Sequence, residues 1–281
     1  RRQRQMCIRD SVIVIRGEGG MGKSTLALRA AERFAWRFPQ GILGISLENL
    51  PTKEVLARRI GTFLLGDAFE RIPEAQREET AIEAMRRARA LLILDNYETL
   101  TQAAEAGDRR LAARELTQFI GKLSGGESVL LITSREQVKG LAASEMLLDG
   151  LDPDSGRELF WDYARQRRRE ADETLTAQLV DKVGGHPLAL ELLGATFGER
   201  LDTGLPDFIR GLDAELGRAE SLYKSDRQAT LGGSFDYSFQ FLSPEAKLLF
   251  PKLGMFEAPF LAEQVAVIFK QPDAAKILNE L

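Results

Sequence analysis

The first half of the chain alternates short apolar runs with segments of helical periodicity. The apolar runs are Ser11–Ile15, Gly41–Ser46, Ala90–Leu94, Ser128–Thr133 and Glu145–Leu148. The central runs are continuous in β-branched residues and leucine, which is typical of strands that are buried on both faces. The helical segments between them supply the crossovers that a parallel sheet requires. The pattern therefore predicts an α/β fold in which helices flank a parallel sheet.

The helix expected after the first run can be checked by its spacing. Its apolar residues recur at positions that share one helical face: Ala27, Ala31, Phe34, Ala35 and Phe38. Pro39 then ends the helix. Further helices are expected over about residues 73–89 and 111–123. Trp36 and Trp161 fall on predicted helices, so we interpret both as packing residues.

The character of the chain changes after Leu151, where runs of Val, Ile and Thr disappear. Helical patterns follow over about residues 155–168, 173–183 and 188–199. A second change falls around Arg218–Asp226, where polar residues interrupt the periodicity. These positions predict two domain boundaries, with a helix-rich last segment.

The segment Gly17–Ser24 reads GEGGMGKS and matches the phosphate-binding pattern G-x-x-x-x-G-K-[ST] at every fixed position. It follows a buried strand and opens an amphipathic helix. Glycines let the backbone wrap so that N–H groups point at phosphate oxygens, and the helix N-terminus adds partial positive charge. We expect Lys23 to neutralise the β- and γ-phosphates and the Ser24 hydroxyl to bind Mg²⁺. The residues expected to contact the nucleotide are Gly17, Gly19, Gly20, Met21, Gly22, Lys23, Ser24 and Thr25.

The third apolar run is followed by an acid, Asp95. A carboxylate at the carboxyl end of a buried strand faces the same crevice as the P-loop. Asp95 is therefore a candidate Mg²⁺ ligand, directly or through water, with a helix cap or turn residue as the alternative. The next residue, Asn96, cannot take a proton, so Glu98 is the candidate general base if hydrolysis occurs. A solvated loop residue is the alternative for Glu98.

A further buried run ends in the sequence Thr133-Ser134-Arg135. An arginine at this place could reach a γ-phosphate and report whether it is present. Strands often end in polar residues, so this observation is weak by itself.

Four motifs occur in the order GEGGMGKST, LLILDN, LLITSR and, at Gly184–Leu190, GGHPLAL. In this the chain resembles the STAND-class NTPases of the NB-ARC type. That class includes apoptosome scaffolds, plant disease-resistance proteins and bacterial transcriptional or signalling regulators. The resemblance covers nearly the whole chain, and the last two motifs are its specific part because a P-loop is common to many NTPases.

The resemblance implies a P-loop nucleotide-binding domain over residues 1–151, a small helical domain over 152–216 and the start of a winged-helix domain over 217–281. It implies that Arg135 contacts the γ-phosphate and that Pro187 packs against the adenine, so ATP or ADP with Mg²⁺ is the expected cofactor. In such proteins ADP holds the domains in a closed resting state. Exchange for ATP opens them, and the protein then forms homo-oligomers.

The chain departs from the family pattern in ways that bear on hydrolysis. Family members often carry two acids where this chain has Asp95-Asn96, so slow ATP hydrolysis is expected. A nucleotide-operated switch is therefore favoured, with a motor or remodelling ATPase as the alternative. The upstream adenine-contacting segment is missing or only partly present in Arg1–Asp10, and the late histidine motif is absent. The single histidine, His186, is expected to be structural or at most to line the nucleotide edge.

Charge narrows the possible partners. The 281 residues carry a formal net charge of -4, which gives no support for a nucleic-acid-binding surface over the whole protein. The segment Ser221–Leu281 has six Lys and Arg against seven Asp and Glu. DNA binding needs a basic face to neutralise phosphates, so we interpret this segment as a regulatory interface.

Cysteine usage and hydropathy bear on the compartment. The one cysteine, Cys7, cannot form an intramolecular disulfide, which fits a reducing compartment. No apolar run reaches the ~18 residues of a membrane helix, and the basic start is not a secretory signal. The sequence thus predicts a cytoplasmic protein without a membrane partner. Because it lacks an initial Met and ends inside a helical pattern, we interpret it as a fragment that works with other domains of a longer chain.

Overall fold

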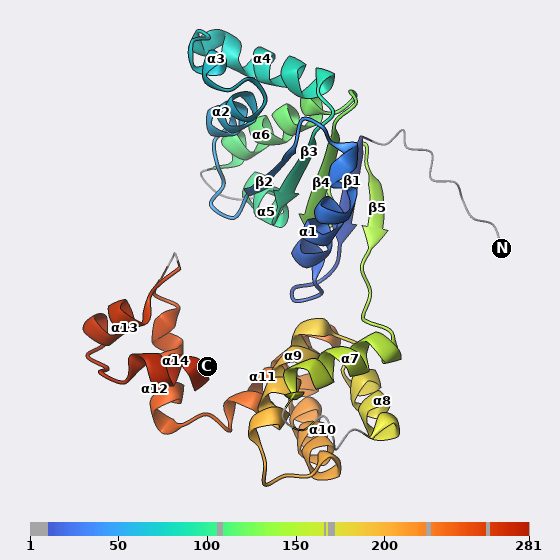
Figure 1. Ribbon diagram of the computed structural model, residues 1–281, viewed down its shortest axis with the longest axis vertical. Helices are drawn as coiled ribbons and strands as arrows, with labels where there is room; N and C mark the ends of the chain where they lie inside the picture. The colour runs from blue at the N-terminus through green and yellow to red at the C-terminus, as the bar shows by residue number, and fades with distance from the viewer. Residues whose placement is uncertain are drawn as a thin grey trace, which may run out of the picture. The chain divides into compact units, whose positions relative to one another are not determined.

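The computed structural model describes most of the chain as two compact units, Arg1–Asp149 and Gly150–Leu281 (Figure 1). The residues described are 11–105, 109–165, 167, 172–222, 226–256 and 259–280. Cys7 and the segment Arg1–Asp10, considered for an adenine contact, lie outside this set.

The five predicted runs form a single parallel sheet in the first unit, in the order β2-β3-β4-β1-β5. The strands are β1 (Val12–Arg16), β2 (Ile42–Ser46), β3 (Leu91–Asp95), β4 (Val129–Ser134) and β5 (Ser144–Leu147). Each strand end lies within one residue of its predicted position. The predicted α/β fold is confirmed. Because β4 lies between β1 and β3, the ends of β1 and β3 are not adjacent, and residues that follow these two strands can meet only beyond the end of β4.

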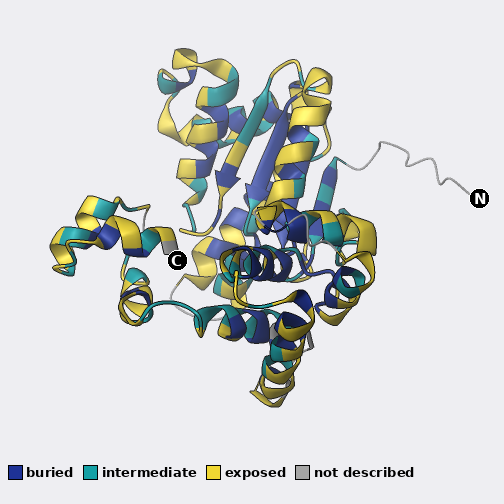
Figure 2. Cartoon of the chain, turned by 60° about the horizontal axis from the view of Figure 1, so that its bottom comes forward, coloured by how far each residue is buried: buried dark blue, intermediate teal, exposed yellow. Residues whose placement is uncertain are grey.

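Two apolar cores cover the two faces of this sheet, because successive side chains of a strand point to opposite faces. On one face Ile15, Ile93 and Leu131 pack with Ala27 and Ala31 of helix α1 (Lys23–Phe34). The other face packs against helices that include α2 (Lys53–Leu65), α4 (Glu74–Arg87), α5 (Glu98–Glu105) and α6 (Arg110–Leu123). Figure 2 shows the central strands β1, β3 and β4 as mostly dark, buried ribbons between helices that are exposed on their outer sides.

The connection from β2 to β4 holds helices that the sequence pattern did not predict: α2, α5 and the short α3 (Asp67–Glu70). Leu56, Ala57 and Ile60 of α2 are buried, at spacings that favour a helix. Thr52 begins this helix as a cap, with its hydroxyl accepting from the Val55 N–H at 3.4 Å. The signal was therefore present in the sequence, in a segment where polar residues dilute it.

Trp36 corrects the prediction that both tryptophans pack in a core. It lies in the short 3₁₀ turn η1 (Ala35–Arg37) after α1 and is 79% exposed. Trp161 is 5% exposed and does pack, with its Nε1–H donating to the Thr176 hydroxyl at 3.1 Å. Helix α1 ends at Phe34, which is itself 43% exposed, so Trp36 lies beyond the buried positions Ala27 and Ala31 of that helix.

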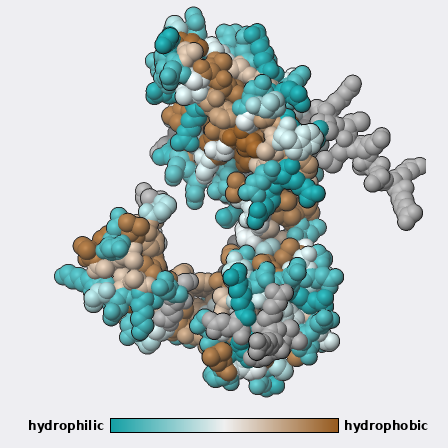
Figure 3. All heavy atoms as spheres, viewed as in Figure 1, coloured by the Kyte–Doolittle hydropathy of each residue, from teal (hydrophilic) through white to brown (hydrophobic). Residues whose placement is uncertain are grey.

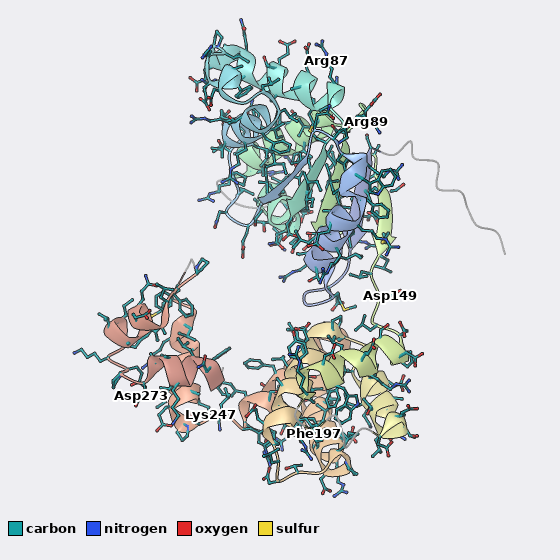
Figure 4. The ribbon with its side chains drawn as sticks, viewed as in Figure 1. Arg87, Arg89, Asp149, Phe197, Lys247 and Asp273 are labelled. Atoms are coloured by element: carbon teal, nitrogen blue, oxygen red, sulfur yellow. The ribbon has the colours of Figure 1, made fainter. Side chains whose placement is uncertain are left out.

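The second unit is helical, with an aromatic core. Its first helices are α7 (Pro153–Tyr163), α8 (Glu173–Lys182), α9 (Pro187–Glu199), α10 (Leu205–Leu222) and α11 (Asp226–Phe239). Edge-on ring contacts link Phe160, Trp161, Phe197, Phe208 and Tyr237, with neighbouring centroids 5.0–5.9 Å apart. Figure 4 labels Phe197 among these helices. Such contacts add to the stabilisation that burial of apolar area provides.

The limit expected between residues 216 and 217 falls inside α10, which is continuous from Leu205 to Leu222. Tyr237, beyond that limit, belongs to the aromatic core of the preceding helices. The extent of each domain stays a prediction, because the division at Asp149 and Gly150 is the one that contacts define.

A separate small core joins the last helices, α12 (Pro244–Leu253), α13 (Ala262–Ile268) and α14 (Ala274–Glu280). Apolar side chains remain exposed on this segment, where Figure 3 shows brown surface: Leu248, Met255, Leu261, Val267 and Ile268. Across the part of the chain that is described, no helix has both the length and the apolar character to cross a membrane.

Candidate nucleotide-binding site

The P-loop joins β1 to α1 and has the backbone conformation that its glycines allow. Gly20 and Gly22 have φ angles of 75° and 81°, in the left-handed region that side chains with a Cβ avoid. The Gly17 N–H donates to the Ser134 carbonyl at 3.2 Å, which ties the start of the loop to the end of β4. Helix α1 begins without a side-chain cap and without an acid in its first turn. Its N-terminal amides are thus suited to an anion.

Lys23 lies across this loop. Its ammonium donates to the Glu18 carbonyl at 2.8 Å, and the residue is 8% exposed. Burial lowers the pKa of Lys23, and the negative charge of Glu98 opposes that change. A buried ammonium with one carbonyl partner can offer its remaining donors to phosphate oxygens.

Asp95 at the end of β3 meets Ser24 in the first turn of α1, although β3 is not a neighbour of β1, the strand that leads into α1. The Ser24 hydroxyl donates to Asp95 Oδ1 at 2.7 Å, across 71 positions of the chain. A hydroxyl and a carboxylate oxygen are the hard ligands that Mg²⁺ takes when it also binds substrate phosphates. The pair fits that ion because Mg²⁺ bound to phosphates needs few protein ligands. Among the described residues, no group of three or more His, Cys, Asp or Glu side chains is placed to hold a metal ion.

Thr133 at the end of β4 is a site residue that the sequence reasoning missed. It is fully buried, and its hydroxyl donates to Asp95 Oδ1 while accepting the Asn96 N–H at 3.1 Å. Thr133 thereby ties the end of β4 to the end of β3 and orients the carboxylate. The signal was available, because a polar residue at the end of a buried strand was the same reason for choosing Asp95.

Asn96 turns the chain from β3 into α5. Its φ of 62° lies in the left-handed region, which asparagine tolerates better than most residues. The turn buries Tyr97 and makes Glu98 the first residue of α5. Glu98 is 6% exposed, so the alternative of a solvated loop residue is wrong.

Glu98 is held by Arg135 at two points. Its Oε1 lies 3.0 Å from Arg135 Nε, and its Oε2 accepts the Arg135 backbone N–H at 3.2 Å. The Arg135 side chain is 62% exposed. It lies against Gly19 of the P-loop, because a Cβ atom added to Gly19 would be 3.6 Å from the guanidinium carbon of Arg135. Arg135 therefore lies beside the P-loop, and its contact with a γ-phosphate stays a prediction.

Pro187 and His186 belong to the second unit. His186 caps α9, with Nδ1 accepting the Ala189 N–H at 3.4 Å, and is 3% exposed, which fits the structural role expected for it. Pro187 is the first residue of α9, where proline is tolerated. Its packing against adenine stays a prediction.

The two glycines before His186 fasten the start of the second unit. Gly185 has a φ of 63°, and a Cβ there would lie 2.2 Å from the Leu151 carbonyl oxygen. The Leu151 N–H donates to the Gly185 carbonyl at 2.8 Å. The GGHP element therefore has a local structural reason for its glycines, independent of any nucleotide.

The sheet order, the glycine-lined loop at a helix start and the carboxylate beside the P-loop serine define a P-loop NTPase. The NACHT domain model matches residues 11–167, so the chain belongs to the NACHT domain family of STAND-class P-loop NTPases. The STAND class expected from the sequence is confirmed. The NB-ARC type stays a prediction.

The chain resembles longer bacterial proteins. It is 26% identical over 279 residues to the regulatory protein AfsR of Streptomyces griseus, covering 96% of this chain and 27% of AfsR. It is 29% identical over 219 residues to an uncharacterised WD repeat-containing protein of Nostoc sp., covering 70% of this chain and 17% of that protein. The chain thus spans less than a third of the length of these relatives.

A solved structure supports the fold. It is the STAND protein with a tetratricopeptide repeat sensor from Pyrococcus horikoshii, with a TM-score of 0.55 and 19% identity. The likeness covers 96% of this chain and 36% of that protein.

Proposed function

We propose that this chain is the ATP- and ADP-binding molecular switch of a regulatory protein, with ADP in the resting state and ATP in the active state. The observation that carries the proposal is the meeting of an ammonium, a hydroxyl–carboxylate pair and a guanidinium at one edge of the sheet. These groups come from α1, from the end of β3 and from the residue after β4. Their chemistry suits a nucleotide polyphosphate with Mg²⁺.

Each group has a distinct task in this proposal. Lys23 neutralises the β- and γ-phosphates, and the amides of the loop bind phosphate oxygens. Ser24 and Asp95 hold Mg²⁺, which supplies charge neutralisation when it is bound. Arg135 distinguishes ATP from ADP, because its guanidinium lies beside Gly19 of the P-loop.

Slow hydrolysis fits the carboxylates near the loop. Asn96 stands where a second acid would be, and the nearby carboxylate of Glu98 is engaged by Arg135. Glu98 would accept a proton from water as the general base after this pair loosens. The second candidate is a motor or remodelling ATPase, which the burial of Glu98 beside the site favours. Turnover of many ATP per minute would support that candidate.

The name of AfsR, a regulatory protein, supports placing the switch in a regulator, and signal transduction is the proposed context. We further propose that the ATP state forms homo-oligomers, that other domains of a longer chain complete the protein, and that it works in the cytoplasm. The membrane and nucleic acid are not proposed as partners of this region.

Calorimetric titration with ADP and then ATP, each with Mg²⁺, tests the proposal. The wild type should bind ADP more tightly, and Lys23→Ala should lose roughly 100-fold in affinity because a buried charged contact to phosphate is removed. Lys122→Ala is the matched control, since Lys122 is 58% exposed on α6 and pairs with Glu78. Equal loss in both variants, or binding of neither nucleotide by the wild type, would contradict the proposal.

A further inference from the structure

Glu98 is the buried anion that Arg135 contacts in the site. Both of its oxygens are engaged by Arg135, one by the side chain and one by the backbone N–H. Because the backbone contact does not depend on the guanidinium, Glu98 would stay in place if the Arg135 side chain moved. Glu98 is thus a fixed negative charge, and the Arg135 side chain is the movable partner.

Glu98 also acts on Lys23. Among the charged groups that affect the pKa of Lys23, Glu98 has the largest influence, ahead of Arg135 and Asp95. One buried carboxylate therefore lies within electrostatic reach of both cations that are proposed to bind the γ-phosphate. Arg135, in turn, is beside Gly19 of the P-loop.

We propose that Glu98 is an internal competitor of the γ-phosphate for Arg135, and that it thereby sets the preference of the site for ADP over ATP. This inference rests on the proposed function as a nucleotide switch. Glu98 neutralises Arg135, so the charge available to a γ-phosphate is reduced. A terminal phosphate also places new negative charge near the buried carboxylate, which is unfavourable at low dielectric. ADP lacks that phosphate and avoids both costs.

The test compares Mg²⁺–ADP with the Mg²⁺ complex of a β,γ-imido ATP analogue, titrated calorimetrically into the 281-residue chain. Glu98→Gln keeps the size of the side chain and removes its charge. We expect it to tighten binding of the analogue by about tenfold, the scale of one charged hydrogen bond, with ADP affinity changed far less. Glu98→Asp keeps the charge and should retain the wild-type preference.

The matched control is Glu105→Gln, at the other end of α5. Glu105 is 63% exposed and lies 3.5 Å from Lys139 in a surface pair, so its loss should leave the ratio of the two affinities unchanged. Thermal unfolding of each variant checks that it folds. If Glu98→Gln does not fold, Arg135→Gln tests the same competition from the exposed partner and should weaken the analogue more than ADP.

The double variant Glu98→Gln with Arg135→Gln separates competition from direct repulsion. The gain in affinity for the ATP analogue that Glu98→Gln gives should be smaller in the Arg135→Gln background. Without the Arg135 guanidinium, Glu98 and the γ-phosphate have no shared partner to compete for. An unchanged ratio in Glu98→Gln, a weaker analogue complex, or a gain of equal size in both backgrounds would overturn the inference while leaving nucleotide binding intact. A wild-type chain that binds neither nucleotide would instead overturn the proposed function and this inference with it.

Discussion

The phosphate edge of the sheet, at the carboxyl ends of β1, β3 and β4, and the aromatic bundle of the second unit each bury a charged side chain, and the partners of these two side chains differ in kind. At the edge, the buried carboxylate of Glu98 pairs with the side chain of Arg135, and Ser24 pairs with Asp95. In the bundle, Arg167 is 5% exposed and donates to the backbone carbonyls of Phe197, Arg200 and Thr203.

The difference indicates what each region is built to do. A side chain that bonds to backbone carbonyls has partners that stay fixed while the helices are folded. In a pair of polar side chains the more exposed member can rotate, so its partner can be exchanged for a phosphate or a metal ion. We therefore expect substitutions in the bundle to change stability and substitutions at the edge to change ligand binding.

The largest effect is expected for Arg167→Ala. The Arg167 guanidinium also lies 3.9 Å from the ring centroid of Phe197. Its removal leaves several carbonyls without their charged donor and should lower the free energy of unfolding by about 3 kcal/mol. Urea unfolding monitored by circular dichroism measures it. Arg210→Ala, at a residue 77% exposed with an (i, i+3) ion pair, is the control. A similar loss of unfolding free energy in Arg167→Ala and Arg210→Ala would contradict the view that Arg167 stabilises the bundle through its backbone partners.

A smaller effect, on ligand binding, is expected for Thr133→Val. The change removes the hydroxyl that orients Asp95 and accepts the Asn96 N–H. ADP affinity in the presence of Mg²⁺ should fall about tenfold, while affinity measured in EDTA should change little. Titrations in both buffers check this. Thr80→Val is the control, since the Thr80 hydroxyl bonds to the Gln76 carbonyl of its own helix. Equal losses with and without Mg²⁺ would show that Thr133 has no special link to the metal site.

An effect of comparable size, this time on stability, separates backbone strain from crowding in the P-loop. A Cβ at Gly22 or at Gly44 would meet nothing within 4 Å, but Gly22 has a φ of 81°. Gly22→Ala should cost about 1–2 kcal/mol of stability because the left-handed conformation is unfavourable for alanine. Gly44→Ala should change stability by less than about 0.5 kcal/mol. Chemical unfolding of both variants tests the comparison, and equal costs would contradict it.

The smallest expected effect is a pH dependence at Lys23. Burial lowers the pKa of Lys23 from 10.5, although Glu98 opposes the shift. The unfolded chain therefore holds this proton more tightly, and the contribution of Lys23 to stability rises with pH from the lowered pKa up to 10.5. Lys23→Met lacks this cost of a buried charge. Its stability advantage at neutral pH should shrink as the pH approaches 10.5. Thermal unfolding at several pH values measures the difference, and an advantage that is constant with pH would refute the linkage.

The sequence by itself determined the parallel sheet, the P-loop and the class of protein. Continuous apolar runs can be buried on both faces only in a sheet that is covered by helices, so the strand ends were predictable to within one residue. The P-loop was equally predictable, because a phosphate-binding loop needs glycines at a fixed spacing, followed by a lysine and a serine, here Lys23 and Ser24, at a helix start. Asp95 followed from the rule that strand ends face the crevice.

Only the tertiary structure decided which polar groups act on one another. Thr133, Asp95 and Ser24 are distant in the sequence and meet because β4 lies between β1 and β3. The burial of Glu98 follows from the left-handed turn at Asn96, and the exposure of Trp36 from the place where α1 leaves the sheet. Periodicity reports which face of an element is apolar. The partner of a polar side chain depends on strand order and on single turns, which no local pattern encodes.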